Sequence, residues 1–169
     1  MNFPPHFTRR ELQCRCGCGL CNPRDELLQL AEDVRAALGN TPMDVTSCCR
    51  CEAHNKRVGG SPTSKHLTGR ALDFVPRSIT PGTAFFMIAS DWARGELDLL
   101  GGLGLYDTFI HIDTARAEDG HLRVWDNRKV KKPEDSTLFL SFVRTLKTMT
   151  SPRPQSAINR LAAAVNSWR

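Results

Sequence analysis

The sequence has no long apolar run and few aromatic residues. None of its hydrophobic stretches approaches the ~20 consecutive apolar residues that cross a bilayer, so we expect no transmembrane segment. The opening residues, MNFPPHFTRREL, lack the apolar region of a secretory signal, so we expect no unaided Sec export. With 169 residues, of which 40% are hydrophobic and 7% aromatic, the chain is expected to form one domain with a modest core.

Acidic residues are scarce near the end of the chain. From residue 128 onward there are nine Lys or Arg residues against only Glu134 and Asp135, whereas the preceding residues are close to neutral. A basic segment favours polyanions such as nucleic acid, anionic lipid or an acidic wall polymer, although a solvated surface has the same composition. Charge alone does not choose among these partners.

The same end of the chain contains a linker pattern and a helical pattern. Residues 151–154, Ser-Pro-Arg-Pro, indicate a linker, so we predict a domain over residues 1–150 followed by a linker and short helix over 151–169. The apolar side of that helix has five members: Ile158, Leu161, Ala162, Val165 and Trp168. This amphipathic helix is the candidate for contact with an anionic membrane or outer-membrane surface.

The number of cysteines is odd, so they cannot all pair within the chain. Four of the seven lie between Cys14 and Cys21, and three lie between Cys48 and Cys51. Cys18 and Cys21 have the C-x-x-C spacing of a zinc knuckle, whereas C-x-C pairs are tight for one tetrahedral ion. The sequence allows three states for these cysteines. They could bind a second, structural zinc ion at this Cys cluster, form one or two disulfides between the two segments, or stay as reduced thiols.

Short strands separated by helices predict an α+β fold with a small antiparallel sheet flanked by helices. We expect helices from the capping box at Thr8, from Asn22-Pro23 to Gly39, over 52–58, over 80–93 and over 138–146. We expect strands over 43–47 and 70–75, a hairpin ending at residue 113, and an edge strand over 121–125. Gly101, Gly102 and Gly104 are not followed by a helix, which excludes a dinucleotide loop. There is no internal repeat.

Two histidines and two carboxylates stand out in this frame. His66 precedes Asp73 by seven residues across a glycine turn, and His111 shares a strand face with Asp113. Either histidine alone would more simply be structural. Two imidazoles and one carboxylate, however, make a three-ligand set for zinc that leaves a fourth position to water, which is typical of catalytic sites.

Three motifs carry a resemblance to a known family. They are Ser47-Cys-Cys-Arg50-Cys-Glu-Ala-His54-Asn55-Lys-Arg-Val58-Gly59-Gly60, then Ser64-x-His66-x-x-Gly69-x-Ala71-x-Asp73, then Phe109-Ile-His111-Ile-Asp113. From about Pro5 to Trp125 the chain resembles the zinc D-alanyl-D-alanine carboxypeptidases and murein endopeptidases, which share a fold with lysostaphin-type peptidases and the hedgehog signalling domain. It is most similar to a short bacterial and phage group with a Cys-rich opening segment.

The resemblance implies a role for each matching residue. It implies that His66, Asp73 and His111 bind one catalytic Zn²⁺ ion. It also implies that Arg50 faces the scissile carbonyl or a substrate carboxylate, and that Ser64 lines the substrate cleft.

One position departs from the family pattern. Several members have a catalytic Glu or Asp three residues before the last histidine, where this chain has Thr108. The general base is then Asp113, our first choice, or Asp107 in the turn before the strand. The competing role for Asp113 is to orient a metal ligand, and that for Asp107 is to cap the turn.

The implied function is that of a zinc metallopeptidase acting as a peptidoglycan hydrolase. Its partners would be peptide stems or cross-links of peptidoglycan, with endopeptidase cleavage favoured over D,D-carboxypeptidase cleavage and no specific nucleic acid expected. Made in the cytoplasm, it would act on the cell wall in the periplasm or as part of a phage particle. The alternative is a non-catalytic, zinc-bearing wall-binding module on the same fold, which Thr108 favours. The bond cleaved and the oligomeric state stay open.

Overall fold

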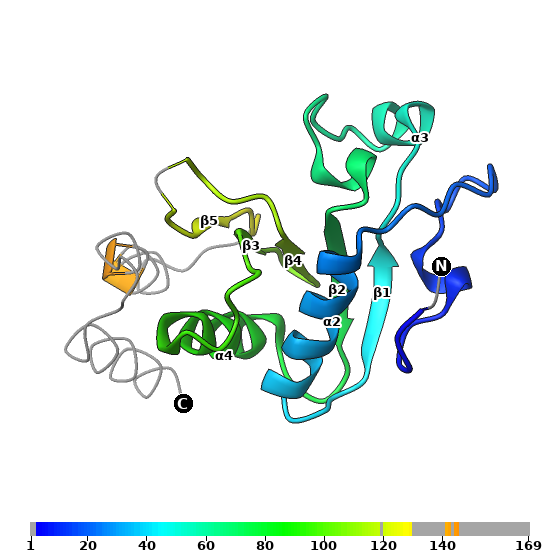
Figure 1. The fold of residues 1–169 in the computed structure, drawn as a ribbon. Coiled ribbons are helices and arrows are strands. Elements are labelled where there is room, and N and C mark those ends of the chain that lie inside the picture. Colours follow the sequence, from blue (N-terminus) through cyan, green and yellow to red (C-terminus); the bar gives the residue numbers. More distant parts are fainter. Residues whose placement is uncertain (1–2, 119, 130–140, 143, 146–169) are drawn as a thin grey trace.

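The computed structural model describes residues 3–118, 120–129, 141–142 and 144–145, and it confirms the α+β class. Within residues 3–129, apart from the undescribed residue 119, a five-stranded sheet is accompanied by four α-helices and one 3₁₀ helix (Figure 1). In chain order the elements are α1 (Arg9–Leu12), α2 (Asp25–Ala37), β1 (Met43–Ser47), α3 (Glu52–Arg57), η1 (Lys65–Thr68), β2 (Ala71–Pro76), α4 (Pro81–Arg94), β3 (Gly102–Leu105), β4 (Ile110–Asp113) and β5 (Arg123–Asp126).

The strands follow the order β1-β2-β4-β3-β5, and the last strand differs from expectation. All neighbours are antiparallel except β5, which runs parallel to β3, so the sheet is mixed rather than purely antiparallel. The reason lies in the connection after β4. The chain leaves β4 at Asp113 and re-enters the sheet at Arg123, and both residues are opposite Gly102. The chain therefore turns back at the end of the sheet where β3 begins, goes past that end of β3, and pairs as β5 with the other edge of β3.

Two helices cover one face of the sheet. Helix α4 packs on β2, β3 and β4, while α2 packs on α4 and β2 (Figure 1). Helix α4 begins as predicted, because the side chain of Thr80 accepts from the Thr83 amide and Pro81 occupies the first helical turn. Helix α2 begins later than predicted, at Asp25, because the amide of Arg24 donates to the carbonyl of Gly69 and keeps that segment extended.

Strand alternation divides the sheet into an apolar face and a polar face. The apolar face points to the helices and includes Leu72, Phe74 and Ile112, each of which is fully buried. On β2 and β4 the intervening residues are Asp73 and His111, which are directly paired across the two strands. The polar face of the sheet is therefore where the site-forming side chains are placed.

A β-bulge at the end of β1 sets which of its residues reaches this face. Val45 pairs with Phe74, but Ser47 pairs with Asp73, so β1 contains one residue more than β2 over this step. Without the bulge, Thr46 would oppose Asp73. The bulge brings Ser47 beside the carboxylate that the sequence placed in the metal site.

Little of the predicted basic end lies among the described residues. Of the helix expected over 138–146, residues 141, 142, 144 and 145 are described and are helical. Phe142 packs on Phe85 and Phe86 of α4, with ring centroids 6.0 and 4.7 Å away. The linker and terminal helix predicted over 151–169 fall outside the described residues, so the domain division and the membrane contact stay predictions.

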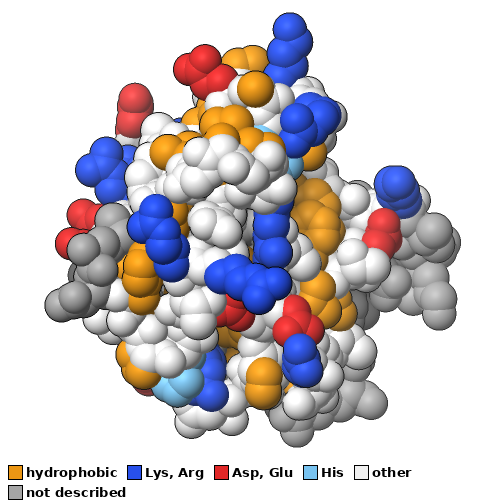
Figure 2. Space-filling model, turned by 90° about the vertical axis from the view of Figure 1, so that its right-hand side faces the viewer, with side chains coloured by type: hydrophobic (Ala, Val, Ile, Leu, Met, Phe, Trp, Pro, Cys, Tyr) orange, Lys and Arg blue, Asp and Glu red, His pale blue; other side chains and the backbone are white. Residues whose placement is uncertain are grey.

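Charged side chains of both signs are mixed on the surface. On the face shown in Figure 2, Lys and Arg side chains gather near the middle, with Asp and Glu side chains scattered among and around them. An exposed ion pair joins Arg77 to Asp44 at 2.7 Å. Among the described residues, none of the helices combines the length and the apolar character needed to span a membrane.

Candidate metal centre

Three side chains from three different elements converge on the polar face of the sheet. His66 comes from η1, Asp73 from β2 and His111 from β4, and their ligand atoms all lie within 4.8 Å of one another. Asp73 Oδ2 lies 3.2 Å from His66 Nε2, and Asp73 Oδ1 lies 2.7 Å from His111 Nδ1. All three side chains are buried. The structure thus brings together the three residues that the sequence proposed as ligands.

A main-chain contact orients His66. Its Nδ1 donates to the carbonyl of Cys48 at 2.7 Å, and its own carbonyl accepts from the amide of Arg50 at 3.1 Å. With the proton on Nδ1, the lone pair of Nε2 faces the carboxylate of Asp73. Two electron-rich atoms at 3.2 Å repel each other unless a proton on Nε2 or a metal ion lies between them. The donor set therefore fits a divalent metal of the zinc type.

The loop that carries His66 depends on a close main-chain approach at Gly69. This residue has a φ of +65°, and a Cβ atom there would lie 2.0 Å from the carbonyl oxygen of Asn22. Only glycine meets both conditions without displacing the neighbouring chain. Gly69 allows the chain to turn from η1 into β2, which explains how a separation of seven residues still yields one site.

The electrostatics of the centre also favour a cation. Although burial opposes the charged forms, the hydrogen bonds from His111 and His66 hold the pKa of Asp73 well below its usual range. Burial lowers the pKa of His111, but the carboxylates of Asp113 and Asp73 outweigh it and raise that pKa to about 9. Both ring nitrogens of His111 face carboxylate oxygens, so this ring carries a positive charge when no metal is bound.

Arg50 lies at the edge of the centre. Its Nη2 donates to Asp73 Oδ2 at 2.6 Å, and its Nε donates to the hydroxyl of Ser47 at 2.7 Å. The side chain is 15% exposed, so solvent reaches part of it. Ser64 lies directly before η1, two residues from His66, and is partly exposed.

The two glycines of β3 form a gap in the side-chain layer of the polar face. Gly104 lies opposite His111 on one side and Trp125 on the other, while Gly102 lies opposite Asp113 and Arg123 in the same way. A Cβ at Gly104 would lie 2.5 Å from the Trp125 ring. Because β3 has no side chains here, residues of β5 reach across it to β4.

Two residues of β5 use this gap to contact the centre. Trp125 packs on His111 with ring centroids 5.2 Å apart, and its indole nitrogen donates to the hydroxyl of Tyr106 at 3.2 Å. Arg123 donates to Asp113 Oδ1 and, at 2.8 Å, to the carbonyl of Ala115. These contacts make β5 part of the support of His111.

Asp113 is enclosed on all sides. It is 1% exposed, Oδ1 accepts from the Ala115 amide at 2.8 Å and from Arg123, and Oδ2 lies 3.2 Å from His111 Nε2. Burial raises its pKa, but the hydrogen bond from His111 and the charge of Arg123 hold that pKa below the usual range. This geometry favours a carboxylate that orients His111 over one that exchanges protons with a substrate.

The other predicted base lies elsewhere on the same hairpin. Asp107 is exposed in the turn between β3 and β4, and its carboxylate accepts from the amide of Lys129 at 3.2 Å. Thr108, at the position where the resemblance led us to look for an acid, is also exposed. Asp107 is therefore the hairpin carboxylate that solvent reaches.

Sequence reasoning did not identify Ser47, Gly102, Gly104, Arg123 or Trp125 as parts of the site. One signal was available in the sequence. Gly102 and Gly104 are on the same face of an expected strand, and glycine in a strand often marks a place where another part of the chain comes close. Which residues come close depends on how the strands pair, and local sequence patterns do not encode that pairing.

A family model described as Peptidase M15 matches residues 5–113. The match includes all three candidate metal ligands, Arg50 and Asp113, and it ends before β5. No curated protein matches the chain.

Proposed function

The chain belongs to the peptidase M15 family of zinc peptidases, and from this premise we propose that it hydrolyses a peptide bond in the stem peptides or cross-links of peptidoglycan. Endopeptidase cleavage is favoured over removal of a terminal D-residue, because the motifs are most similar to the short murein hydrolases. The observation that carries the proposal is the convergence of His66, Asp73 and His111, with ligand atoms within 4.8 Å of one another.

The residues of the centre would have different roles in such a reaction. A zinc ion held by His66 Nε2, Asp73 and His111 Nδ1 would supply activation of a water molecule and polarisation of the substrate carbonyl. Arg50, which already binds Asp73 and is partly open to solvent, is placed to donate to a carbonyl oxygen or carboxylate of the substrate. Removing one such donor typically reduces turnover by ~10²–10³-fold.

The two hairpin carboxylates take different roles. Asp113, held by Arg123 and buried beneath His111, positions the imidazole so that Nδ1 faces the metal. For the general base we propose Asp107, because it is the hairpin carboxylate that is exposed to solvent. This assignment reverses our first choice from the sequence, because alternation along β4 places Asp113 on the correct face but does not reveal its burial.

The test measures products and metal together. Purified protein is incubated with a defined mixture of cross-linked muropeptides, with and without a chelator, and products are identified by mass spectrometry. We expect a chelator-sensitive cleavage that His66→Ala abolishes. If the metal binds at this centre but no stem peptide or cross-link is cleaved, the protein is a wall-binding module instead.

A pair of matched variants separates the two carboxylates. Asp113→Asn should lower zinc affinity ~10–100-fold, as is typical when the partner of a ligating histidine is lost. Asp107→Asn should leave zinc affinity unchanged and lower kcat ~10²–10⁴-fold. If Asp107→Asn has full activity, Asp107 is not the base.

A further inference from the structure

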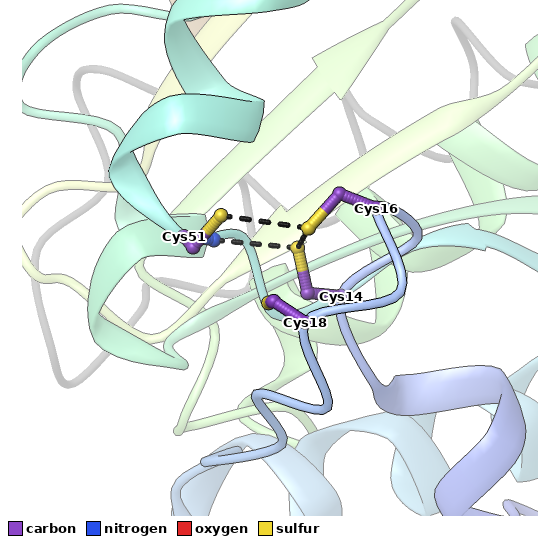
Figure 3. A group of neighbouring side chains, drawn as sticks. All are labelled: Cys14, Cys16, Cys18 and Cys51. Carbon is purple, nitrogen blue, oxygen red and sulfur yellow. Dashed lines mark hydrogen bonds between the residues drawn. The ribbon is translucent and has the colours of Figure 1, made fainter.

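A second group of potential metal ligands lies away from the peptidase centre. The thiols of Cys14, Cys16, Cys18 and Cys51 all lie within 4.8 Å of one another. Cys14 Sγ is 3.4 Å from Cys16 Sγ, which is 3.6 Å from Cys51 Sγ. The sulfurs of these three residues point toward a common centre (Figure 3). Two segments separated by more than thirty residues meet here.

These separations match a tetrahedral thiolate site. With a zinc–sulfur distance of about 2.3 Å, the sulfurs of a tetrahedron are about 3.8 Å apart. The two sulfur pairs given above lie within about 0.4 Å of that value. From this geometry we propose that Cys14, Cys16, Cys18 and Cys51 bind a structural zinc ion, separate from the ion of the peptidase centre.

The main chain is already shaped around these sulfurs. The amide of Cys51 donates to Cys14 Sγ, and the amide of His54 donates to Cys51 Sγ, each at 3.4 Å. The ring Nδ1 of His54 lies 3.2 Å from Cys14 Sγ. N–H groups directed at sulfur stabilise thiolates and disperse the negative charge of a four-thiolate site.

A tight turn brings three of the four thiols onto one ion. Gly17 and Gly19 both have positive φ angles, of +85° and +76°, which non-glycine residues rarely adopt. They alternate with the cysteines, so the chain wraps around the cluster in the space of five residues. This explains how C-x-C spacing, which is tight for one ion in a regular strand, becomes compatible with a single site.

The remaining three cysteines are placed differently. Cys48 and Cys49 are 1% exposed and belong to the hydrophobic core, while Cys21 Sγ lies 3.9 Å from the carbonyl of Arg9. The C-x-x-C spacing of Cys18 and Cys21 therefore does not define the site. Cys51, which lies thirty-three residues after Cys18, supplies the fourth thiol instead.

The proposed ion would join the N-terminal segment to the loop that carries Arg50. Cys51 follows Arg50 directly, and Arg50 donates to Asp73 in the peptidase centre. The same loop accepts the His66 hydrogen bond through Cys48. A structural ion at Cys51 thus restrains the loop that orients one ligand and one substrate-facing residue, which gives it a role in the rigidity of the active site.

The experiment counts metal ions in matched variants purified under reducing conditions. We expect two zinc ions per chain in the wild type, one in Cys16→Ser and Cys18→Ser, and two in the control Cys21→Ser. His66→Ala should lose the other ion and keep the thiolate-bound one. A wild-type protein that holds the thiolate-bound ion but no ion at His66, Asp73 and His111 would overturn the proposed function and leave this site intact, so the two proposals fail separately.

Cobalt substitution provides a readout that is independent of activity and of the cysteine variants. In His66→Ala loaded with Co²⁺, intense thiolate-to-cobalt charge-transfer absorption is expected, together with protection of Cys18 from alkylation. A wild-type protein with a single ion that His66→Ala removes would overturn the proposal. Disulfides among these four cysteines, detected by mass spectrometry of protein purified without a reductant, would overturn it as well.

Discussion

Replacing Gly102 by alanine tests whether the gap in β3 supports the metal centre. The new Cβ would lie 2.3 Å from Asp113 Oδ2 and 2.7 Å from Arg123 Nη2. Ordinary contact begins near 3.4 Å, so the carboxylate must move by about 1 Å. Asp113 is buried and bonded through both oxygens, so it cannot move without loss of the 3.2 Å contact to His111 Nε2.

The expected effects differ for stability and for metal binding. Overpacking a buried site destabilises by ~1–3 kcal/mol, and replacing glycine in a strand stabilises by ~0.5–1 kcal/mol, so the free energy of unfolding should fall by at most ~2.5 kcal/mol. Zinc affinity should fall ~10–100-fold because His111 loses its oriented partner. Urea unfolding of the metal-free protein and competition with a chromophoric chelator measure the two quantities.

Gly82→Ala is the matched control. Its Cβ would have no neighbour nearer than the Thr80 hydroxyl at 3.8 Å, and alanine is favoured in a helix. Stability should be unchanged or higher, and zinc affinity should be unchanged. A Gly102→Ala protein that binds zinc and cleaves muropeptides like the wild type would refute the view that β5 and Asp113 support the centre through this gap.

The contacts of Arg50, Thr8 and Phe74 allow three further tests. Arg50→Lys should fail to restore the activity lost in Arg50→Ala, because an ammonium group cannot donate to Ser47 and Asp73 while facing substrate; kcat/KM measures this. Thr8→Ala should lower the free energy of unfolding by ~0.5–2 kcal/mol without changing zinc content, because it removes the capping box with Glu11. Phe74→Ala, at a fully buried position between the sheet and the helices, should lower it by ~3–5 kcal/mol, measured by urea unfolding. A change below 1 kcal/mol at Phe74 would contradict the assigned core.

Much of the local structure follows from the sequence alone. The capping box at Thr8, the Thr80-Pro81 start of α4 and the alternation over residues 71–75 each act through neighbours within a few residues. Local rules of this kind need no information on tertiary contacts. The start of α2 is the exception, because the bond from Arg24 to Gly69 joins distant segments.

The candidate ligands were accessible to sequence reasoning for a similar reason. His66, Asp73 and His111 are chemically distinctive, and a family motif records their spacing. Asp113 was placed correctly on the face of His111 by strand alternation. The orienting role that we propose for it depends on burial under Arg123, which comes from a strand two positions away in the sheet.

What the sequence determined by itself is the pattern of helices and strands, the α+β class and the identity of the candidate metal-binding side chains. Only the tertiary structure decided that β5 lies parallel to β3, that Arg123 and Trp125 cross the glycine gap, and that Cys51 rather than Cys21 joins the N-terminal thiols. The physical reason is the range of the interactions. Periodicity and capping depend on residues that are adjacent along the chain, whereas strand order, burial and thiol grouping depend on which distant segments pack together.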